Sequence, residues 1–272
     1  MEQFNVYTKT YGNGVKEVYL PLHPVNHMGL PANHQIEVFK ADPEKNIEKN
    51  IRDVLNRARK TVYEVAICND WDYMITITFS SENVDRFDLQ AVFLELRYQL
   101  KYLKYLYPRF NYLLVPEYHV KVDEFGRRAI HFHGLISGLP STEFGPYEWT
   151  RDGFMKPLKR LHKNLGRTYC SLVDSKDRVA GYIVKYITKD LILVGMHKSS
   201  YICSRGLKRA DRHRYTIRTD QVDYFRRLAY SYTAEVFEAP FGSRFSFPDL
   251  NMSDKEMFDR MFILCSFFDD DD

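Results

Sequence analysis

The sequence predicts an α+β protein, with a ferredoxin-like or RRM-like antiparallel sheet that carries helices on one face. Segments in which apolar and polar residues alternate, as in strands, are interleaved with segments of helical apolar spacing. Their order along the chain is strand, helix, strand, strand, helix, strand, helix. Strand pairs with interleaved helices in this order favour the ferredoxin topology. A chain of 272 residues can bury a full core in one or two domains.

The N-terminal part of the chain contains a long predicted helix and the first core strand. Residues 1–40 show short β-like pieces between Gly and Pro turns, without a clear order. Apolar residues at helical spacing predict an amphipathic helix over 43–67, with Asp42 as its N-cap and Pro43 in its first turn. From Met74 to Phe79 apolar and threonine side chains alternate, which predicts a strand.

The remaining predicted elements follow without long linkers. They are a helix over 88–107, strands over 111–121 and 128–137, a helix near 155–165, a short strand over 169–173 and a helix over about 177–192. Pro108 ends the first of these helices, and residues 122–127 join the two long strands as a hairpin. Pro116 cannot donate to a ladder, so its strand is expected to be an edge or to bulge there. Asp174 or Ser175 can cap the last helix.

The net charge of +3 hides an uneven distribution. Residues 151–218 contain 17 Lys/Arg against five Asp/Glu, a balance of +12, and we call this segment the basic block. Residues 220–272 contain five Lys/Arg against 12 Asp/Glu, a balance of −7, and end in an expected acidic tail over 269–272. A basic block is typical of polyanion-binding surfaces, although an ordinary solvated surface can have the same composition.

The composition also excludes several classes of protein. The four cysteines are scattered with no Cys-x-x-Cys pair, which disfavours a zinc ribbon or a disulfide framework and fits a reducing cytosol. No apolar run approaches the ~20 residues that cross a bilayer, and the N-terminus lacks the features of a signal peptide. The sequence therefore predicts a cytoplasmic globular protein without a membrane partner.

Two histidines, His131 and His133, flank one apolar residue in the predicted strand over 128–137. Residues two apart in a strand face the same side, and neutral imidazole is a ligand for divalent ions. A hairpin register that pairs 117 with 133 and 119 with 131 would add Glu117 and His119 to that face. Glu117, His131 and His133 are the candidate metal ligands, with His119 as a substitute or supporting group. The alternative is that the histidines pack in a sheet and Glu117 is an exposed carboxylate.

Tyr182 and Tyr186 lie four residues apart, so they share a face of the predicted helix. Lys185 and Lys189 each follow a tyrosine by three residues, which places an ammonium group beside each phenol. A phenol with a pKa of about 10 is a poor nucleophile at neutral pH, and a nearby cation stabilises the phenolate. These four residues are candidates for covalent catalysis on a phosphodiester. The alternative is that Tyr rings and Lys stems cover the edge of a core.

In this order, the segments resemble the HUH superfamily of rolling-circle replication initiators over roughly residues 60–210. The three motifs of that superfamily are matched by Met74–Phe79, by His131–His133 and by Tyr182–Lys189. The doubled Tyr-x-x-Lys pattern is similar to the paired tyrosines of initiators from small single-stranded DNA phages. Residues 115–118 lie where the superfamily often places its acidic ligand, and residues 204–209 are similar to a segment of plasmid and phage members.

The resemblance implies an origin-specific single-stranded DNA endonuclease and strand transferase that forms a 5′-phosphotyrosine. The residues to which it assigns roles are Glu117, His131 and His133 for Mn²⁺ or Mg²⁺, Tyr182 and Tyr186 as nucleophiles, and Lys185 and Lys189 for charge balance or protonation of the leaving oxygen. Its implied partners are single-stranded DNA at a replication origin and a host DNA polymerase. A separate helicase is expected as well, because the chain has no Gly-x-x-x-x-Gly-Lys-Ser/Thr pattern.

The resemblance also suggests how the chain divides. Residues 68–218 would be the HUH endonuclease core, with the basic block as a single-strand channel. Residues 1–67 would be an extension whose long helix packs on the core, and residues 219–272 a C-terminal extension with the acidic tail. The rival readings are an HUH transposase, a relaxase-like strand transferase, and a non-catalytic nucleic-acid-binding protein. The motif order and the lack of a Cys-rich ribbon disfavour the first two.

Overall fold

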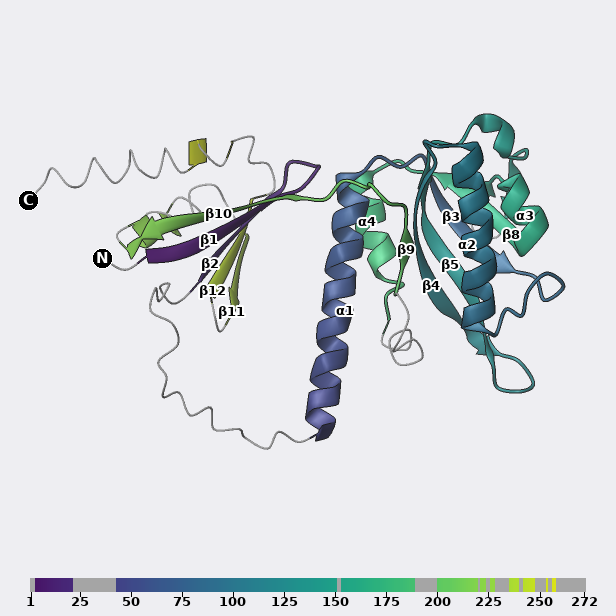
Figure 1. The fold of residues 1–272 in the computed structure, drawn as a ribbon, viewed down its shortest axis with the longest axis horizontal. Coiled ribbons are helices and arrows are strands. Elements are labelled where there is room, and N and C mark those ends of the chain that lie inside the picture. The colour runs from purple at the N-terminus through teal and green to yellow at the C-terminus, as the bar shows by residue number, and fades with distance from the viewer. Residues whose placement is uncertain are drawn as a thin grey trace, which may run out of the picture. The chain divides into compact units, whose positions relative to one another are not determined.

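The computed structural model shows two compact units, residues 40–208 and residues 1–39 with 209–272 (Figure 1). The structure describes residues 3–21, 43–150, 153–188, 200–219, 221–223, 226–227, 235–239, 242–247, 253 and 256–257. These divisions differ from the predicted boundaries at 67/68 and 218/219. The reason is that the long helix α1 (Pro43–Cys68) contacts α4 (Lys176–Val184) and belongs with the central unit.

The unit over residues 40–208 is built on a five-stranded sheet in the order β8-β3-β5-β4-β9, with every neighbouring pair antiparallel. Its strands are β3 (Tyr73–Phe79), β4 (Asn111–Val122), β5 (Arg128–Ser137), β8 (Gly166–Leu172) and β9 (Ile202–Cys203). Helix α2 (Leu89–Leu106) connects β3 to β4, and α3 (Lys159–Leu165) lies between β5 and β8. This connectivity and strand order are those of a ferredoxin-like sheet, so the predicted fold class is confirmed.

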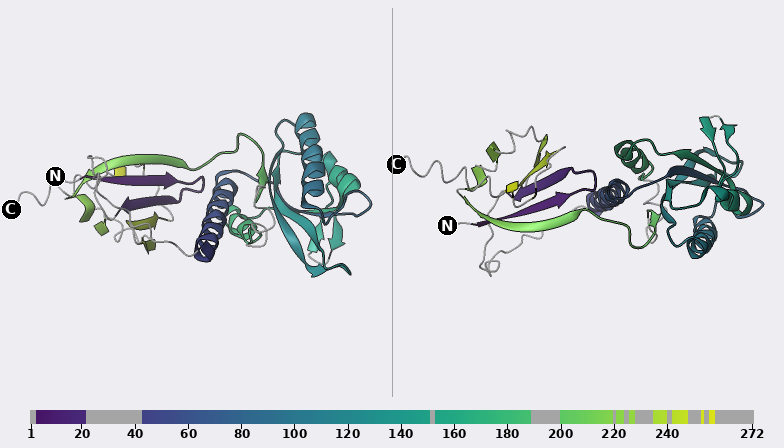
Figure 2. Two further views of the ribbon diagram at one scale, coloured as in Figure 1. Left: turned by 60° about the horizontal axis from the view of Figure 1, so that its bottom comes forward. Right: turned by 90° about the horizontal axis from the view of Figure 1, so that it is seen from above.

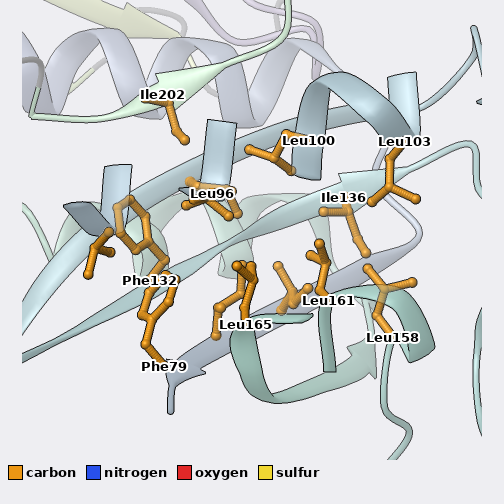
Figure 3. Packing of buried hydrophobic residues seen from close by; sticks show 14 of the residues in the cluster. Phe79, Leu96, Leu100, Leu103, Phe132, Ile136, Leu158, Leu161, Leu165 and Ile202 are labelled. Carbon is orange, nitrogen blue, oxygen red and sulfur yellow. The ribbon is translucent and has the colours of Figure 1, made fainter. Parts of the chain in front are cut away.

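The hydrophobic core of this unit lies between one face of the sheet and helices α2 and α3 (Figure 3). Residues Ile75, Ile77 and Phe79 of β3 face it because strand side chains alternate between the two faces. Phe132 is fully buried in it and meets the rings of Phe79 and Phe93 edge-on, with centroids 5.9 and 5.2 Å away. Burial of one such ring stabilises the fold by about 1.5–3 kcal/mol.

The opposite face of the sheet is on the side of α1 and α4 (Figures 1 and 2). The two threonines of β3 and the two histidines of β5 project to this side, because their strand neighbours fill the core. Helix α1 contacts both α4 and β4. The second face is therefore the one on which a chemical site can be assembled.

Several element boundaries differ from the sequence prediction. The helix expected near 155–165 begins only at Lys159, because residues Gly153–Met155 form strand β7 and pair with β6 (Glu148–Thr150). The predicted strand over 169–173 is β8 and starts earlier, at Gly166. Gly166 has φ +130°, and a Cβ there would meet Ser80 N at 2.5 Å, so the close turn into β8 requires glycine.

The second unit contains another five-stranded antiparallel sheet, in the order β10-β1-β2-β12-β11. Its strands are β1 (Gln3–Thr10), β2 (Lys16–Pro21), β10 (Asp211–Arg218), β11 (Glu235–Ala239) and β12 (Gly242–Phe247). The β-like pieces predicted within residues 1–40 are β1 and β2. Their pairing with C-terminal strands was not predicted, because such long-range pairing leaves no local signal.

The core of this second sheet is formed by one of its faces. Phe4, Val6, Val18, Phe245 and Phe247 are all buried in one cluster. The same strands therefore present their alternate side chains on the other face.

Candidate metal and tyrosine site

Two threonine–histidine pairs form the floor of the site. Thr76 is the register partner of His133, and Thr78 is the partner of His131. Each threonine Oγ1 lies 3.2 Å from the Nδ1 of its histidine. A ligating imidazole is usually held by a hydrogen bond at its other nitrogen, so these threonines orient both rings with Nε2 available. The sequence shows the alternation of Ile and Thr in β3, but the pairing of each Thr with a His was not predicted.

Glu117 joins the histidine face through a register that differs from the predicted one. The prediction paired 117 with 133 and 119 with 131, which is wrong, because Glu117 pairs with His131 and Val115 with His133. The difference arises at a bulge between Tyr118 and Val122, where β4 carries two more residues than β5. An insertion of two residues leaves the strand facing the same way. Glu117 therefore stays on the predicted side of the sheet.

The bulge is stabilised by one guanidinium group. Arg128 Nε donates to the carbonyl of His119 at 2.8 Å, and Arg128 Nη2 donates to the carbonyl of Tyr118 at 3.1 Å. Carbonyls that leave the ladder need such a donor, because an unpaired buried polar group costs free energy. Pro116 pairs with Phe132, and β9 contacts β4 only at Leu113 and Leu114, so β4 is an edge at Pro116, as predicted.

Glu117 and His133 are in direct contact. Glu117 Oε2 lies 2.9 Å from His133 Nε2, and this hydrogen bond holds the pKa of Glu117 below its usual range. In this arrangement Nε2–H of His133 donates to the carboxylate, and Nδ1 accepts from the Thr76 hydroxyl. The hydroxyl can also accept from Nδ1–H, so Thr76 can hold the ring in either tautomer.

His131 is the more buried partner of a stacked histidine pair. Its ring lies against that of His119, with centroids 4.9 Å apart and planes at 22°. Burial, together with the charges that His119 and His133 could carry, lowers the pKa of His131 to about 4. His131 is therefore neutral at physiological pH, which is the state that binds a metal ion. The proximity of His119 to the candidate ligands agrees with the predicted supporting position.

The donor set fits a divalent ion in its chemistry. Within the described part of the chain, no three His, Cys, Asp or Glu side chains are already spaced as a formed metal site. Here the carboxylate and an imidazole of the candidate set bond to each other, with Glu117 taking the position next to His133 Nε2. Two neutral imidazoles and one carboxylate suit Mn²⁺ or a similar ion better than Mg²⁺, which prefers oxygen ligands.

The tyrosine segment folds differently from the prediction. Helix α4 ends at Val184, so the helix predicted over about 177–192 is too long, and residues 189–192 lie outside the described residues. After the helix, Tyr186 N donates to Ile183 O at 3.3 Å and Ile187 N to Val184 O at 3.1 Å, in a tighter i to i−3 pattern. Tyr182 lies in α4, whereas Tyr186 lies in the turn beyond it.

The two tyrosines nevertheless meet at the site. The Tyr186 ring stacks on His133, with centroids 3.8 Å apart and planes at 8°. Tyr186 OH donates to Tyr182 OH at 2.5 Å, and the two rings meet edge-on at 5.3 Å. Lys185 Nζ lies 4.7 Å from the centroid of the Tyr182 ring, as the Tyr-x-x-Lys spacing predicts. Lys189 lies outside the described residues.

The turn that carries Tyr186 is anchored by α1. Arg59 Nε donates to the carbonyl of Ile187 at 3.0 Å. At the other end of α4, the Ser175 side chain accepts from Arg178 N at 3.3 Å, which confirms Ser175 as the cap. Lys176 Nζ donates to Asp70 at 2.6 Å, and this hydrogen bond lowers the pKa of Asp70. Sequence reasoning missed the role of Arg59, because nothing in the sequence relates it to Ile187.

The segment 204–209 connects β4 to the end of α1. Ser204 exchanges two hydrogen bonds with the backbone of Tyr112, at 3.0 and 2.9 Å. Lys208 does the same with the Asn69 side chain, at 2.9 and 3.0 Å. This segment therefore closes the central unit on the side of the candidate site, where α1 lies.

Residues 72–191 match a family model of replication-associated proteins, described as the ORF2 type. Neither a curated protein nor a solved structure matches the chain. The matched segment contains all the candidate metal ligands and both tyrosines, and it supports a replication initiator role, which implies DNA binding. Of the helices in the described ranges, none is both long and apolar enough to cross a membrane.

Proposed function

We propose that this protein is an HUH endonuclease of the two-tyrosine type, which nicks single-stranded DNA at an origin and initiates rolling-circle replication. The observation that carries this proposal is the contact between Tyr186 and His133, with ring centroids 3.8 Å apart. It brings a phenol that can attack phosphorus to a face with two imidazoles and a carboxylate. The family match over residues 72–191 gives this contact its context in replication.

In the proposed reaction, the Tyr186 oxygen attacks the scissile phosphorus. The new bond joins the Tyr186 oxygen to phosphorus, and the bond from phosphorus to O3′ breaks. The leaving O3′ takes up a proton, for which the ammonium group of Lys185 is the candidate donor. The products are a 5′-phosphotyrosine and a free 3′-OH, which a host DNA polymerase could extend.

The metal ligands have a supporting role in this scheme. When bound by Glu117, His131 and His133, a divalent ion such as Mn²⁺ would withdraw electron density from the scissile phosphate. Thr76 and Thr78 keep the two imidazoles oriented toward it.

Tyr182 is proposed as the second nucleophile. Its hydroxyl accepts from that of Tyr186, so either oxygen could occupy nearly the same position after a side-chain movement. One tyrosine could then hold the first 5′ end while the other cleaves the regenerated origin. Unwinding would require a separate helicase, and we place the protein in the cytoplasm with its replicating DNA.

The test is formation of a covalent protein–DNA adduct. Wild-type protein is incubated with single-stranded origin oligonucleotides and Mn²⁺, with an EDTA control, and the products are separated on a denaturing gel. We expect an adduct that depends on the metal and on tyrosine hydroxyls. Failure of every candidate origin to give an adduct, with or without EDTA, would reject the nuclease. Cleavage of transposon ends instead of a replication origin would favour a transposase.

A further inference from the structure

The second unit presents a row of cationic and aromatic side chains across four strands. Arg214 of β10 pairs with Tyr7 of β1, Tyr7 with Tyr19 of β2, and Tyr19 with Arg244 of β12. Directly paired residues of an antiparallel sheet share a face, so the four side chains project to the same side. The two central rings lie 6.4 Å apart, and Tyr7 is 45% exposed.

This side is the face opposite the core of the sheet. Tyr7 and Arg214 alternate along their strands with buried Val6 and Ile217, which lie in the hydrophobic cluster. A face that carries both rings and guanidinium groups while its reverse is packed is a surface for a ligand rather than a second core.

The charge of this face fits a polyanion. Among the described residues that project to it, the basic ones are Lys9, Arg212, Arg214, Arg218 and Arg244, and the acidic ones are Glu17 and Glu235. The three arginines of β10 are exposed. Part of the basic block therefore lies in this unit and not around the tyrosines, so it is not all used by a channel at the candidate active site.

We propose that this face of the second sheet binds single-stranded DNA, with bases stacked on Tyr7 and Tyr19 and phosphates on the flanking arginines. Aromatic side chains on a basic sheet are how single-stranded nucleic acid is held in several folds, because every base has a face that can stack. A duplex could reach the arginines, but its bases are already stacked on each other and cannot cover the rings.

The proposal goes beyond the proposed function by adding a second DNA contact outside residues 72–191, the segment matched by the replication family. It takes only the identity of the nucleic acid, DNA, from that function. The ordinary alternative is that these pairs merely stabilise the sheet, since cross-strand aromatic and polar pairs contribute about 0.2–1 kcal/mol each.

The test measures binding apart from cleavage. The full chain with Tyr182→Phe and Tyr186→Phe is titrated, without metal, into a fluorescent oligothymidylate, and anisotropy is followed between about 50 and 200 mM salt. Arg212→Gln with Arg214→Gln is compared with Arg226→Gln with Arg227→Gln, which removes the same charge from exposed positions of this unit off the sheet. Thermal unfolding of every variant checks the fold.

We expect Arg212→Gln with Arg214→Gln to weaken binding about tenfold and to lower the salt slope by about 1.4, for two lost phosphate contacts at about 0.7 each. Tyr7→Leu should weaken binding about tenfold with an unchanged slope. A slope equal to that of the Arg226/Arg227 control would overturn the proposal. If Tyr7→Leu unfolds, Arg214→Gln alone decides, because that side chain is exposed.

Competitors decide the nature of the ligand. Unlabelled oligothymidylate should displace the probe at lower concentration than duplex DNA or oligouridylate, and equal or better competition by either one would reject the assignment to single-stranded DNA. Wild-type protein is tested in parallel for the origin adduct. Normal adduct formation with unchanged oligothymidylate binding by the sheet variants would reject this inference alone, and the reverse result would reject only the proposed nuclease.

Discussion

The ring of Tyr186 lies flat on the imidazole of His133, with the two planes at 8°. The contact joins a turn that follows α4 to the middle of β5, two segments that are about fifty residues apart in the sequence. It separates the roles of the two tyrosines, because only Tyr186 stacks on a candidate metal ligand, whereas Tyr182 lies within the helix.

Tyr186→Phe is expected to abolish the first nick, with adduct formation reduced at least about 100-fold because the attacking oxygen is lost. The phenyl ring keeps the stack on His133, so Mn²⁺ affinity should stay within about twofold, which isothermal titration can measure. Tyr182→Phe is the matched variant and should retain the first nick but lose strand transfer to a second origin. If Tyr182→Phe alone removed the first adduct, the assignment of the two tyrosines would be reversed.

Thr78→Val is expected to weaken Mn²⁺ binding by about 10- to 100-fold, because His131 loses the group that orients its Nδ1. The substitution is nearly isosteric, so the fold should be retained, and circular dichroism checks this. Thr142→Val, at an exposed position outside the sheet, is the control. Equal Mn²⁺ affinity in both variants would exclude Thr78 from the site.

The stability of the metal-free protein should fall as the pH decreases from about 6.5 to about 4. His131 has its pKa lowered to about 4, chiefly by burial, so the unfolded chain binds more protons than the folded protein in this window. The contribution is fully present above the window and is lost through it, by ~1–2 kcal/mol after allowance for solvent screening. Urea unfolding at several pH values should show a flatter profile for His131→Gln, and an identical profile would contradict the assignment.

Arg128→Lys is expected to lower adduct formation about tenfold, because a single ammonium cannot hold both bulge carbonyls and the position of Glu117 then relaxes. Arg127→Lys is the neighbouring control, since Arg127 pairs with exposed Asp123 in the turn. Activity of the two lysine variants is compared at saturating Mn²⁺. A loss that saturating Mn²⁺ fully restores would indicate weaker metal binding only.

Local patterns in the sequence are sufficient for most of the central unit. The alternation in β3 and β5 and the helical spacing in α2 are local signals, and they predict the ferredoxin-like sheet and the shared face of the two histidines. The assignment of Glu117, the histidines and the tyrosines to metal binding and catalysis stays a prediction, although the structure places these side chains together.

Features that depend on distant partners could not be predicted. No Gly or Pro marks the end of α4 at Val184, and the turn after it is held by Arg59, 128 residues before Ile187. The hairpin register was extended from the turn at 122–127 as if β4 were regular. Only the reach of Arg128 to two carbonyls accounts for the irregular pairing.

The bulge between Tyr118 and Val122 also determines how this hairpin can change in length. Because side chains alternate with a period of two, adding or removing residues in pairs shifts the tip along the strand while each ligand keeps its orientation. A change of one residue would turn Glu117 into the hydrophobic core and leave a carboxylate there without water. The hairpin can thus be lengthened or shortened by parity-conserving steps, so a loop near the cleavage chemistry could vary between relatives without altering that chemistry.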